Sequence, residues 1–384
     1  MRKNIKKSNG EGSIWEETRN GKPYYRASVV VGRNSDGNPI RKTFSGYKKG
    51  EVIEKMQKAQ YEVKNNILTL GDEILFSHFF KNWIFDFKKI EVSSNTFAEY
   101  EVCYRTKILP YDISKVKIKD LTPNILQEYF NYLLNSEKLS INCIKKIHRK
   151  IKSCLQFAIV QNVIIRNPII VVTLPKEKQE EKYKVFSKEE QQLILGALGE
   201  NVVDKIILTG FFTGLRLGEI LALRWEDLEG GLLKIRRQYQ KNIDVVDVGV
   251  KKLSYVFKEL KTDKSKRDVP LTENIIELLS GIDKKSELIF CDEEGKPIER
   301  KRPTRQLNRI CRDLNIIERP FHSVRHTYAT RMFELEIPIK TVQVLLGHSE
   351  IAVTMDIYTH VMIDKKIEAI AKLNNLFKEN ESFT

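Results

Sequence analysis

The sequence predicts a multidomain protein with a small α+β module at the N-terminus, an all-α middle region and a mixed α+β, mainly α, C-terminal region. A chain of 384 residues is too long for one ordinary hydrophobic core. Its apolar residues alternate near the N-terminus and then recur at helical spacing. The charged segment 175–184 lacks apolar periodicity, which is typical of an exposed linker. We therefore expect three regions, at 1–68, 72–175 and 176–384.

The first region is predicted to be a three-stranded sheet with one helix. Ala27 and Val29 belong to an alternating stretch, which the turn-forming residues 34–38 separate from the next strand. Apolar residues recur at helical spacing through 48–67, so a helix is expected to pack on the sheet. Residues 1–50 hold 12 lysines and arginines against 4 acidic residues. The basic residues of the strands are either DNA contacts or a solvated positive surface: Arg26, Arg33, Arg41 and Lys42.

The middle region is predicted to be helical throughout. Leu75, Phe79 and Trp83 mark one amphipathic helix. Thr122 followed by Pro123 is a typical helix start. A third helix has an apolar side formed by Ile144, Ile147, Ile151 and Leu155. Its other side faces either phosphates or water with the basic residues Lys145, Lys146 and Arg149.

The third region begins with a helix at Ser187, because Glu190 three residues later completes a capping box. Helices follow, together with a strand-rich segment near 231–270. The cysteines are widely separated, and no two have the spacing of a zinc knuckle. We expect them to be reduced and mostly buried: Cys103, Cys143, Cys154, Cys291 and Cys311.

The charge of the chain indicates a polyanionic partner. The formal net charge is +15, which suits either nucleic acid or an anionic membrane. The most apolar run, 163–174, is too short to span a bilayer and is interrupted by Arg166. Residues 1–9 are basic and polar, without the apolar core of a signal peptide. A cytoplasmic protein that binds nucleic acid, with no membrane partner, is therefore expected.

Five side chains of the third region have the chemistry that cleavage of a phosphodiester demands. The transition state gathers negative charge on the non-bridging oxygens, so it needs cationic donors held in place. Arginine suits this task because its planar fork grips two oxygens at once. The candidates, in chain order, are Arg216 in TGLRLGE, His322 and Arg325 in HSVR, His348 in LLGHS, and Tyr358.

This ordered set resembles the signature of the tyrosine recombinase, or phage-type integrase, family: an arginine, a lysine, a His-x-x-Arg, a histidine or tryptophan, and a nucleophilic tyrosine. The resemblance implies that Tyr358 attacks a DNA phosphate, which leaves a 3′-phosphotyrosine and a free 5′-hydroxyl. It implies that the phosphate is held and neutralised by Arg216, His322, Arg325 and His348. A tyrosine of ordinary pKa, near 10, needs a proton acceptor, for which His322 is the candidate.

The family also has a lysine that protonates the leaving oxygen, and the resemblance assigns this role to Lys261. Lys-Thr followed by Ser-x-Arg and Val-Pro-Leu matches the family pattern. Lys264 and Lys266 are close rivals, and a phosphate-contacting basic loop is the alternative for the whole stretch.

Glu219 lies three residues after Arg216 and therefore on the same helical face. We expect it either to orient Arg216 or a neighbouring donor, or to form an ordinary surface ion pair. Past Tyr358, apolar residues at helical spacing predict a C-terminal helix, which packs either on a neighbouring protomer or on its own domain.

The resemblance implies an integrase of a mobile element that joins and excises DNA at attachment sites. The first region resembles an arm-site-binding domain, and the middle region resembles a core-site-binding domain. The implied partners are double-stranded DNA and further copies of the chain, which form a tetramer on the DNA. The resemblance is also compatible with two further partners, an excisionase and a DNA-bending host factor. No ATP, metal or other cofactor is expected, because the phosphotyrosine conserves the energy of the broken bond.

Three other functions are compatible with parts of the sequence. The first is a metal-dependent hydrolase, because His322 and His326 stand at i and i+4, a spacing that can chelate zinc, and His348 and His360 could complete the site. Against it, the HSVRH stretch lacks the glutamate of such helices, and Arg325 would set a cation against the metal. A DNA-binding architectural or regulatory protein without chemistry would have the same charge and first two regions. A type IB topoisomerase would share the chemistry, although the basic N-terminal module favours site-specific recombination.

Overall fold

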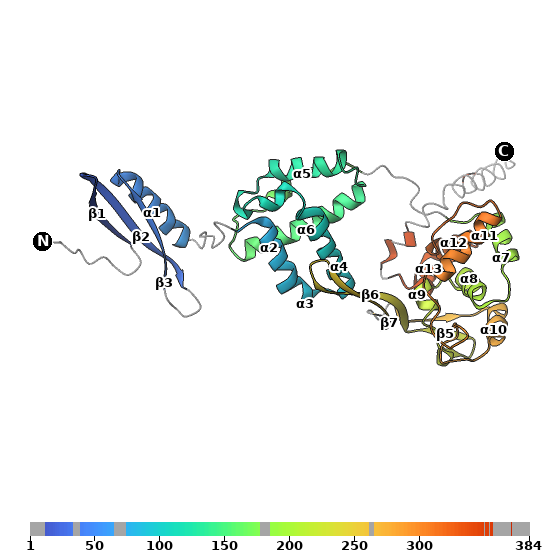
Figure 1. Cartoon of the computed structure of the whole chain (residues 1–384). Helices are drawn as coiled ribbons and strands as arrows, with labels where there is room; N and C mark the ends of the chain where they lie inside the picture. The colour runs from blue at the N-terminus through green and yellow to red at the C-terminus, as the bar shows by residue number, and fades with distance from the viewer. Residues whose placement is uncertain are drawn as a thin grey trace, which may run out of the picture. The chain divides into compact units, whose positions relative to one another are not determined.

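The computed structural model describes residues 12–33, 39–64, 74–176, 185–260, 265–348, 350–352, 354–355 and 370. The chain divides into two compact units: 1–178 with 243–252, and 179–242 with 253–384. The predicted fold class is confirmed, since a small sheet with a helix precedes a helical region and a mixed, mainly helical C-terminal part (Figure 1). The region boundaries expected from the sequence stay predictions.

The N-terminal module is an antiparallel sheet in the order β1-β2-β3, formed by β1 (Ser13–Arg19), β2 (Lys22–Arg33) and β3 (Pro39–Gly46). Asn20 and Gly21 close the first hairpin with φ angles of 52° and 70°, as a tight two-residue turn requires. Helix α1 (Lys49–Lys64) packs on the sheet. The buried core is small and consists of Ala27, Val29, Val52, Met56 and Ala59.

The helical region begins with α2 (Phe76–Asn82), which runs into a π-helical turn, η1 (Trp83–Lys88), and a short α3 (Lys89–Glu91). Trp83 therefore starts a π-turn instead of continuing the predicted α-helix. The remaining elements are α4 (Ser94–Cys103), η2 (Tyr104–Ile108), η3 (Asp112–Lys115), η4 (Ile118–Asp120), α5 (Pro123–Asn135), α6 (Ile141–Val160) and η5 (Pro168–Val171).

Local signals in the sequence account for two of these helices. The Thr122 hydroxyl accepts a hydrogen bond from the Ile125 backbone N–H, and Pro123 is the first residue of α5, as predicted. The predicted apolar side of α6 lies in the core with Phe76, Phe80 and Trp83, and consists of Ile144, Ile147, Ile151 and Leu155.

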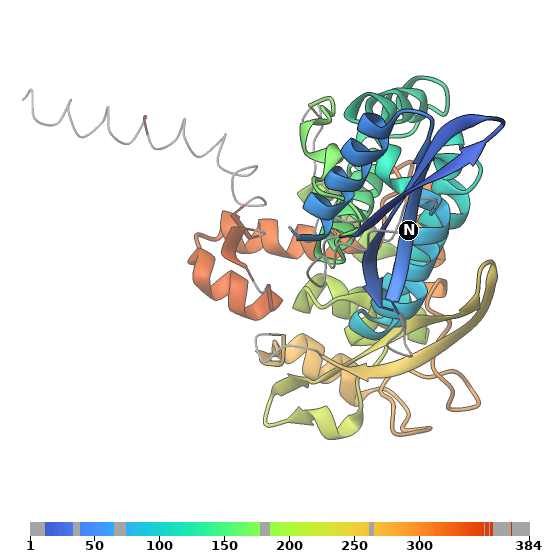
Figure 2. The same cartoon turned by 90° about the vertical axis from the view of Figure 1, so that its left-hand side faces the viewer.

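A segment distant in the sequence completes this helical core. Strands β6 (Arg237–Asp247) and β7 (Val250–Glu259) form a two-stranded ribbon, gold in Figure 2, and its tip, 243–252, belongs to the first unit. Val245 at the tip is buried in the core of the helical region. The backbone N–H of Ile243 donates to Asn95 Oδ1 at 2.9 Å, and that of Gly249 donates to Glu101 Oε1 at 2.8 Å. The sequence contained no signal for this grouping.

The second unit combines a group of helices with a small three-stranded sheet. Its helices are α7 (Lys188–Ala197), α8 (Val202–Thr213), α9 (Leu217–Ile220), α10 (Glu273–Ser280), α11 (Arg302–Asp313), α12 (His322–Glu334) and α13 (Ile339–Leu346), with a 3₁₀ turn at η6 (Trp225–Asp227). The antiparallel sheet has the order β4-β5-β8, formed by β4 (Leu228–Glu229), β5 (Leu232–Ile235) and β8 (Arg267–Pro270). The predicted capping box at Ser187 and Glu190 is present, and strands occupy the predicted strand-rich segment.

Helices α8 and α12 pack closely together, and this brings Arg216, which follows α8, near His322 and Arg325 on α12. Gly210 permits this close packing, because a Cβ there would lie 3.1 Å from Phe321 Cζ and 3.2 Å from Val324 Cγ1.

The cysteines are all free, and each is buried or half-buried, as predicted. Among the residues that the structure describes, no helix has both the length and the hydropathy needed to cross a membrane.

Candidate active site

Arg216 is placed by the turn between α8 and α9. Helix α8 ends at Thr213 and is capped by Gly214, whose φ of 64° is the left-handed conformation that favours glycine. Arg216 then precedes the first residue of α9, and its backbone N–H donates to Glu219 Oε2 at 3.0 Å. Its guanidinium Nη1 donates to Glu219 Oε1 at 2.8 Å. The side chain of Arg216 is 35% exposed, so its cation is accessible from solvent.

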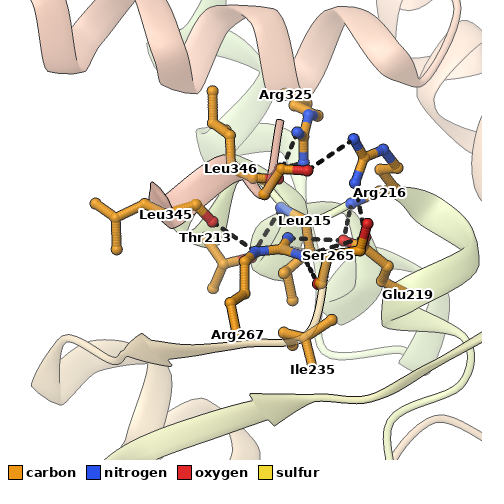
Figure 3. A network of polar contacts seen from close by, with 12 residues as sticks. Thr213, Leu215, Arg216, Glu219, Ile235, Ser265, Arg267, Arg325, Leu345 and Leu346 are labelled. Atoms are coloured by element: carbon orange, nitrogen blue, oxygen red, sulfur yellow. Dashed lines mark hydrogen bonds and ion pairs between the residues drawn. The ribbon is translucent and has the colours of Figure 1, made fainter. Parts of the chain in front are cut away.

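Glu219 is fully buried and binds two arginines (Figure 3). Besides Arg216, it accepts from Arg267 Nη1 at 3.2 Å and from Arg267 Nη2 at 2.8 Å. Burial favours the neutral acid, but hydrogen bonds and charge from Arg267, and the charges of Arg216 and Arg325, outweigh it and lower the pKa of Glu219 to about 2. Of the two interpretations of Glu219, the structure therefore supports contact with Arg216 in the interior, not a surface pair.

Arg325 is the most buried cation of the candidate site among the residues that the structure describes. It lies on the first turn of α12 and is 2% exposed. Its Nη1 donates to the Gly214 carbonyl at 2.9 Å, and its Nη2 donates to the Leu346 carbonyl at 2.6 Å. Within the described part of the chain, its buried Nε has no hydrogen-bond partner. A buried cationic donor without a partner is costly, and an anionic ligand would satisfy it.

His322 and His348 lie in the same cationic environment. Burial and the charges of Arg325 and Arg216 lower the pKa of His322 to about 4, against an opposing effect of Glu219. Burial and the same two arginines lower the pKa of His348 to about 3. His348 follows the C-cap of α13, and its Nδ1 lies 2.9 Å from the Thr354 hydroxyl. Both imidazoles are therefore neutral near pH 7.

The two remaining candidates for chemistry, Tyr358 and Lys261, lie outside the described residues, as does the rival Lys264. The other rival, Lys266, has its Nζ 3.3 Å from Glu259 Oε2 in an exposed ion pair. The predicted C-terminal helix also lies outside the described residues, except for Ile370.

The rings of His322 and His326 meet edge to face, with centroids 4.5 Å apart. In the part of the chain that the structure describes, no group of three or more His, Cys, Asp or Glu side chains has an arrangement that could hold a metal ion.

Four of the predicted DNA-contacting residues are exposed: Arg26, Arg41, Lys146 and Arg149. Arg26 pairs with Glu17 at 3.5 Å, and Arg41 is exposed. Lys42 is half-buried, and the side chain of Arg33 is not among the described ones. On α6, Lys146 and Arg149 are exposed and Lys145 is half-buried. Their role in DNA contact stays a prediction.

Sequence reasoning missed Arg267 as a member of the site. The Ser-x-Arg pattern was a signal, but it served only to locate Lys261. Its partners Glu219 and Leu345 lie 48 and 78 residues away in sequence, so no local pattern connects them.

Two stretches of the sequence match models of known protein families. Residues 184–364 match the phage integrase family, and residues 75–134 match the phage integrase N-terminal SAM-like domain. A relative from Caldanaerobacter subterraneus, named tyrosine recombinase XerC-like, is 31% identical over 94% of this chain and 98% of its own length. The ICEBs1 integrase of Bacillus subtilis is 25% identical over 70% of this chain and 73% of its own length.

Solved structures share the fold. The Tn1549 transposon integrase, in complex with transposon right end DNA, aligns with a TM-score of 0.66 and 20% identity over 78% of this chain and 100% of that chain. A lambda integrase tetramer bound to a Holliday junction aligns with a TM-score of 0.57 and 17% identity over 87% of this chain and 95% of that chain. The match of nearly the whole chain to a named tyrosine recombinase decides the assignment. The chain belongs to the tyrosine recombinase family, that is, the phage integrase family.

Proposed function

We propose that this protein is a site-specific DNA recombinase of a mobile genetic element, which cleaves and rejoins DNA strands through a 3′-phosphotyrosine at Tyr358. The observation that carries the proposal is the buried cationic site. Arg325 has a buried Nε without a partner among the described residues, and Arg216 beside it is accessible. Such a site suits one phosphate, whose negative charge grows in the transition state.

In the proposed cleavage step, the Tyr358 oxygen attacks phosphorus. A bond forms between phosphorus and that oxygen, the bond from phosphorus to the 5′-oxygen breaks, and the 3′ side of the strand becomes attached to the protein. The tyrosine proton passes to His322, whose imidazole is neutral near pH 7 and so has a ring nitrogen free to accept it. The negative charge of a bound phosphate offsets the charges of Arg325 and Arg216, which lower the pKa of His322, and so makes it a stronger base. Lys261 donates a proton to the leaving 5′-oxygen.

Arg216, Arg325 and His348 hold the non-bridging oxygens during this step, and their fixed positions avoid reorganisation as charge develops. Rejoining is the reverse step, in which a 5′-hydroxyl of another strand attacks the phosphotyrosine. The number of phosphoester bonds is conserved, so the reaction as proposed needs neither ATP nor a metal ion.

The finer parts of the proposal draw on the relatives. The integrase names of the ICEBs1 and Tn1549 proteins support a role in a mobile element. The lambda integrase tetramer on a Holliday junction supports a tetramer that exchanges strands in steps. The basic patches around Arg41 on β3 and Arg149 on α6 are the proposed DNA contacts outside the site.

To test the chemistry, the purified protein is incubated in EDTA with DNA taken from beside its own gene. Wild type is expected to become attached to a 3′ end, and Tyr358→Phe is expected to bind DNA without attachment. Tyr255→Phe is the matched control, because it removes a hydroxyl of β7 and keeps the ring, and it should cleave as wild type does.

Attachment that persists in Tyr358→Phe would overturn the assignment of the nucleophile. Binding without any attachment, even on nicked DNA that traps the intermediate, would instead favour a catalytically silent DNA-binding protein. Cleavage that appears only with added metal would favour a hydrolase. The mobile-element role predicts that cells expressing wild type, but not Tyr358→Phe, yield an excised circle whose junction is detected by amplification.

A further inference from the structure

We infer that Arg267 is a positioning residue for strand cleavage: it holds Glu219 and the turn at 345–348 so that Arg216 and His348 keep their places around the phosphate. The inference rests on the proposed function. The added residue lies on β8, in the Ser-x-Arg pattern that follows Lys261, where the sequence alone indicated no role for it.

Arg267 connects three separate segments of the chain (Figure 3). Its Nη1 and Nη2 bind Glu219 on α9, and Nη1 also donates to the Ser265 carbonyl at 3.2 Å. Its Nε donates to the Leu345 carbonyl at the end of α13 at 2.7 Å. The side chain is only 4% exposed, so it does not itself face a DNA backbone at the surface.

The C-terminal end of α13 is where these contacts converge. Three successive carbonyls there each accept from a different arginine: Leu345 from Arg267, Leu346 from Arg325 and Gly347 from Arg216, at 2.7, 2.6 and 3.4 Å. The last carbonyls of a helix have no partners within it and carry its negative partial charge, so cations suit this end. His348 follows directly, and its position depends on the same turn.

Gly347 shows how closely Arg267 packs against this turn. Its φ is +66°, and a Cβ at this position would lie 2.8 Å from Arg267 Nη1 and 3.0 Å from Arg267 Cδ. A side chain at 347 would therefore displace the arginine, since neither the backbone conformation nor the space accepts one.

Charge gives Arg267 a second effect on the site. Glu219 carries one negative charge, and Arg216 and Arg267 carry one positive charge each, so the trio has a surplus of one positive charge. Without Arg267, Glu219 and Arg216 would neutralise each other, and Arg216 would lose much of its attraction for a phosphate. Arg267 thus leaves Arg216 oriented by a carboxylate and still effectively cationic.

The experiment measures single-turnover attachment to DNA at saturating protein, together with DNA affinity and thermal unfolding. Arg267→Met is expected to slow attachment about 10- to 100-fold, by analogy with residues that orient the ligands of metal sites, with DNA affinity changed less than threefold. Arg267→Lys keeps the charge but not the three-way fork, and it should recover part of the rate. Arg237→Met is the matched control, because it removes an arginine from a pair with buried Asp227 that shares no partner with Arg267.

Arg267→Met leaves Glu219 unpaired in the interior and risks misfolding, so the double variant Glu219→Gln with Arg267→Met removes both charges. It should fold and remain slower than wild type, because the support of the turn at 345–348 is still missing, but it should recover the part of the rate that depends on the positive charge of Arg216. The inference is overturned if either variant attaches within twofold of wild type, or if Arg237→Met slows attachment as much. Failure of wild type itself to attach would overturn the proposed function instead, so the two failures are distinct.

Discussion

Two buried glutamates, one in each unit, have opposite surroundings. Glu101 in the helical region pairs with Arg105, which is 37% exposed, and accepts from the backbone N–H of Gly249. Glu219 in the C-terminal unit pairs with two arginines, and Arg325 adds a third charge nearby. The first arrangement is balanced in charge and joins two segments. The second has a surplus of positive charge, and this surplus, rather than burial, distinguishes a candidate phosphate site.

The largest expected effect is on catalysis in the C-terminal unit. Arg325→Ala should slow attachment to DNA by about 100- to 1,000-fold, because it removes a fixed donor to the developing charge. Arg105→Ala removes an arginine from the balanced pair and should leave the rate within a few-fold of wild type. Single-turnover assays on the same nicked DNA compare the two. Equal losses would contradict the distinction drawn between the two glutamates.

The next effect is on stability. Glu219→Ala would leave Arg267 buried without its carboxylate and should cost about 3–5 kcal/mol. Glu101→Ala should cost about 1–3 kcal/mol, since Arg105 can turn to water and the Gly249 N–H is neutral. The units need separate probes, so hydrogen exchange of α8 and of α4 during urea titration is the measurement. A larger cost for Glu101→Ala would reverse our ranking.

The pH dependence should separate the units in the same way. The pKa values of His322 and His348 fall from 6.5 to about 4 and about 3 on folding, and that of Glu219 falls from 4.5 to about 2. The unfolded chain therefore binds more protons than the folded one as pH falls from about 6.5 towards 2, and the C-terminal unit loses stability across that range. Urea unfolding at successive pH values measures the slope. His348→Asn should make it shallower, and an unchanged slope would argue against the buried neutral imidazole.

The last comparison concerns two glycines with left-handed backbones, and the smaller effect is expected at Gly249. Gly249 has a φ of +75°, and a Cβ there would meet Arg105 Cδ at 3.5 Å, an ordinary contact, so Gly249→Ala should cost only about 1 kcal/mol. Gly347→Ala should cost more and also slow attachment, because it meets Arg267. Exchange rates and attachment assays on both variants provide the comparison. Slower attachment to DNA in Gly249→Ala, but not in Gly347→Ala, would contradict this expectation.

Local patterns in the sequence determined much of this protein. The capping box at Ser187, the start of α5 at Thr122 and the apolar side of α6 depend on residues within a few positions of each other, so they could be predicted. The ordered set from Arg216 to Tyr358 identified the family by residue type and order. These features need no knowledge of which distant segments meet.

Only the tertiary structure decided how those residues are supported. The tip of the β6–β7 ribbon reaches Glu101 across 148 residues of sequence, and Arg267 reaches Glu219 across 48 and Leu345 across 78. Sequence periodicity reports which face of an element is apolar, but not which distant element covers it. Contacts of this range are set by packing and by the need to satisfy buried charges, and for that reason the role of Arg267 emerged only from the fold.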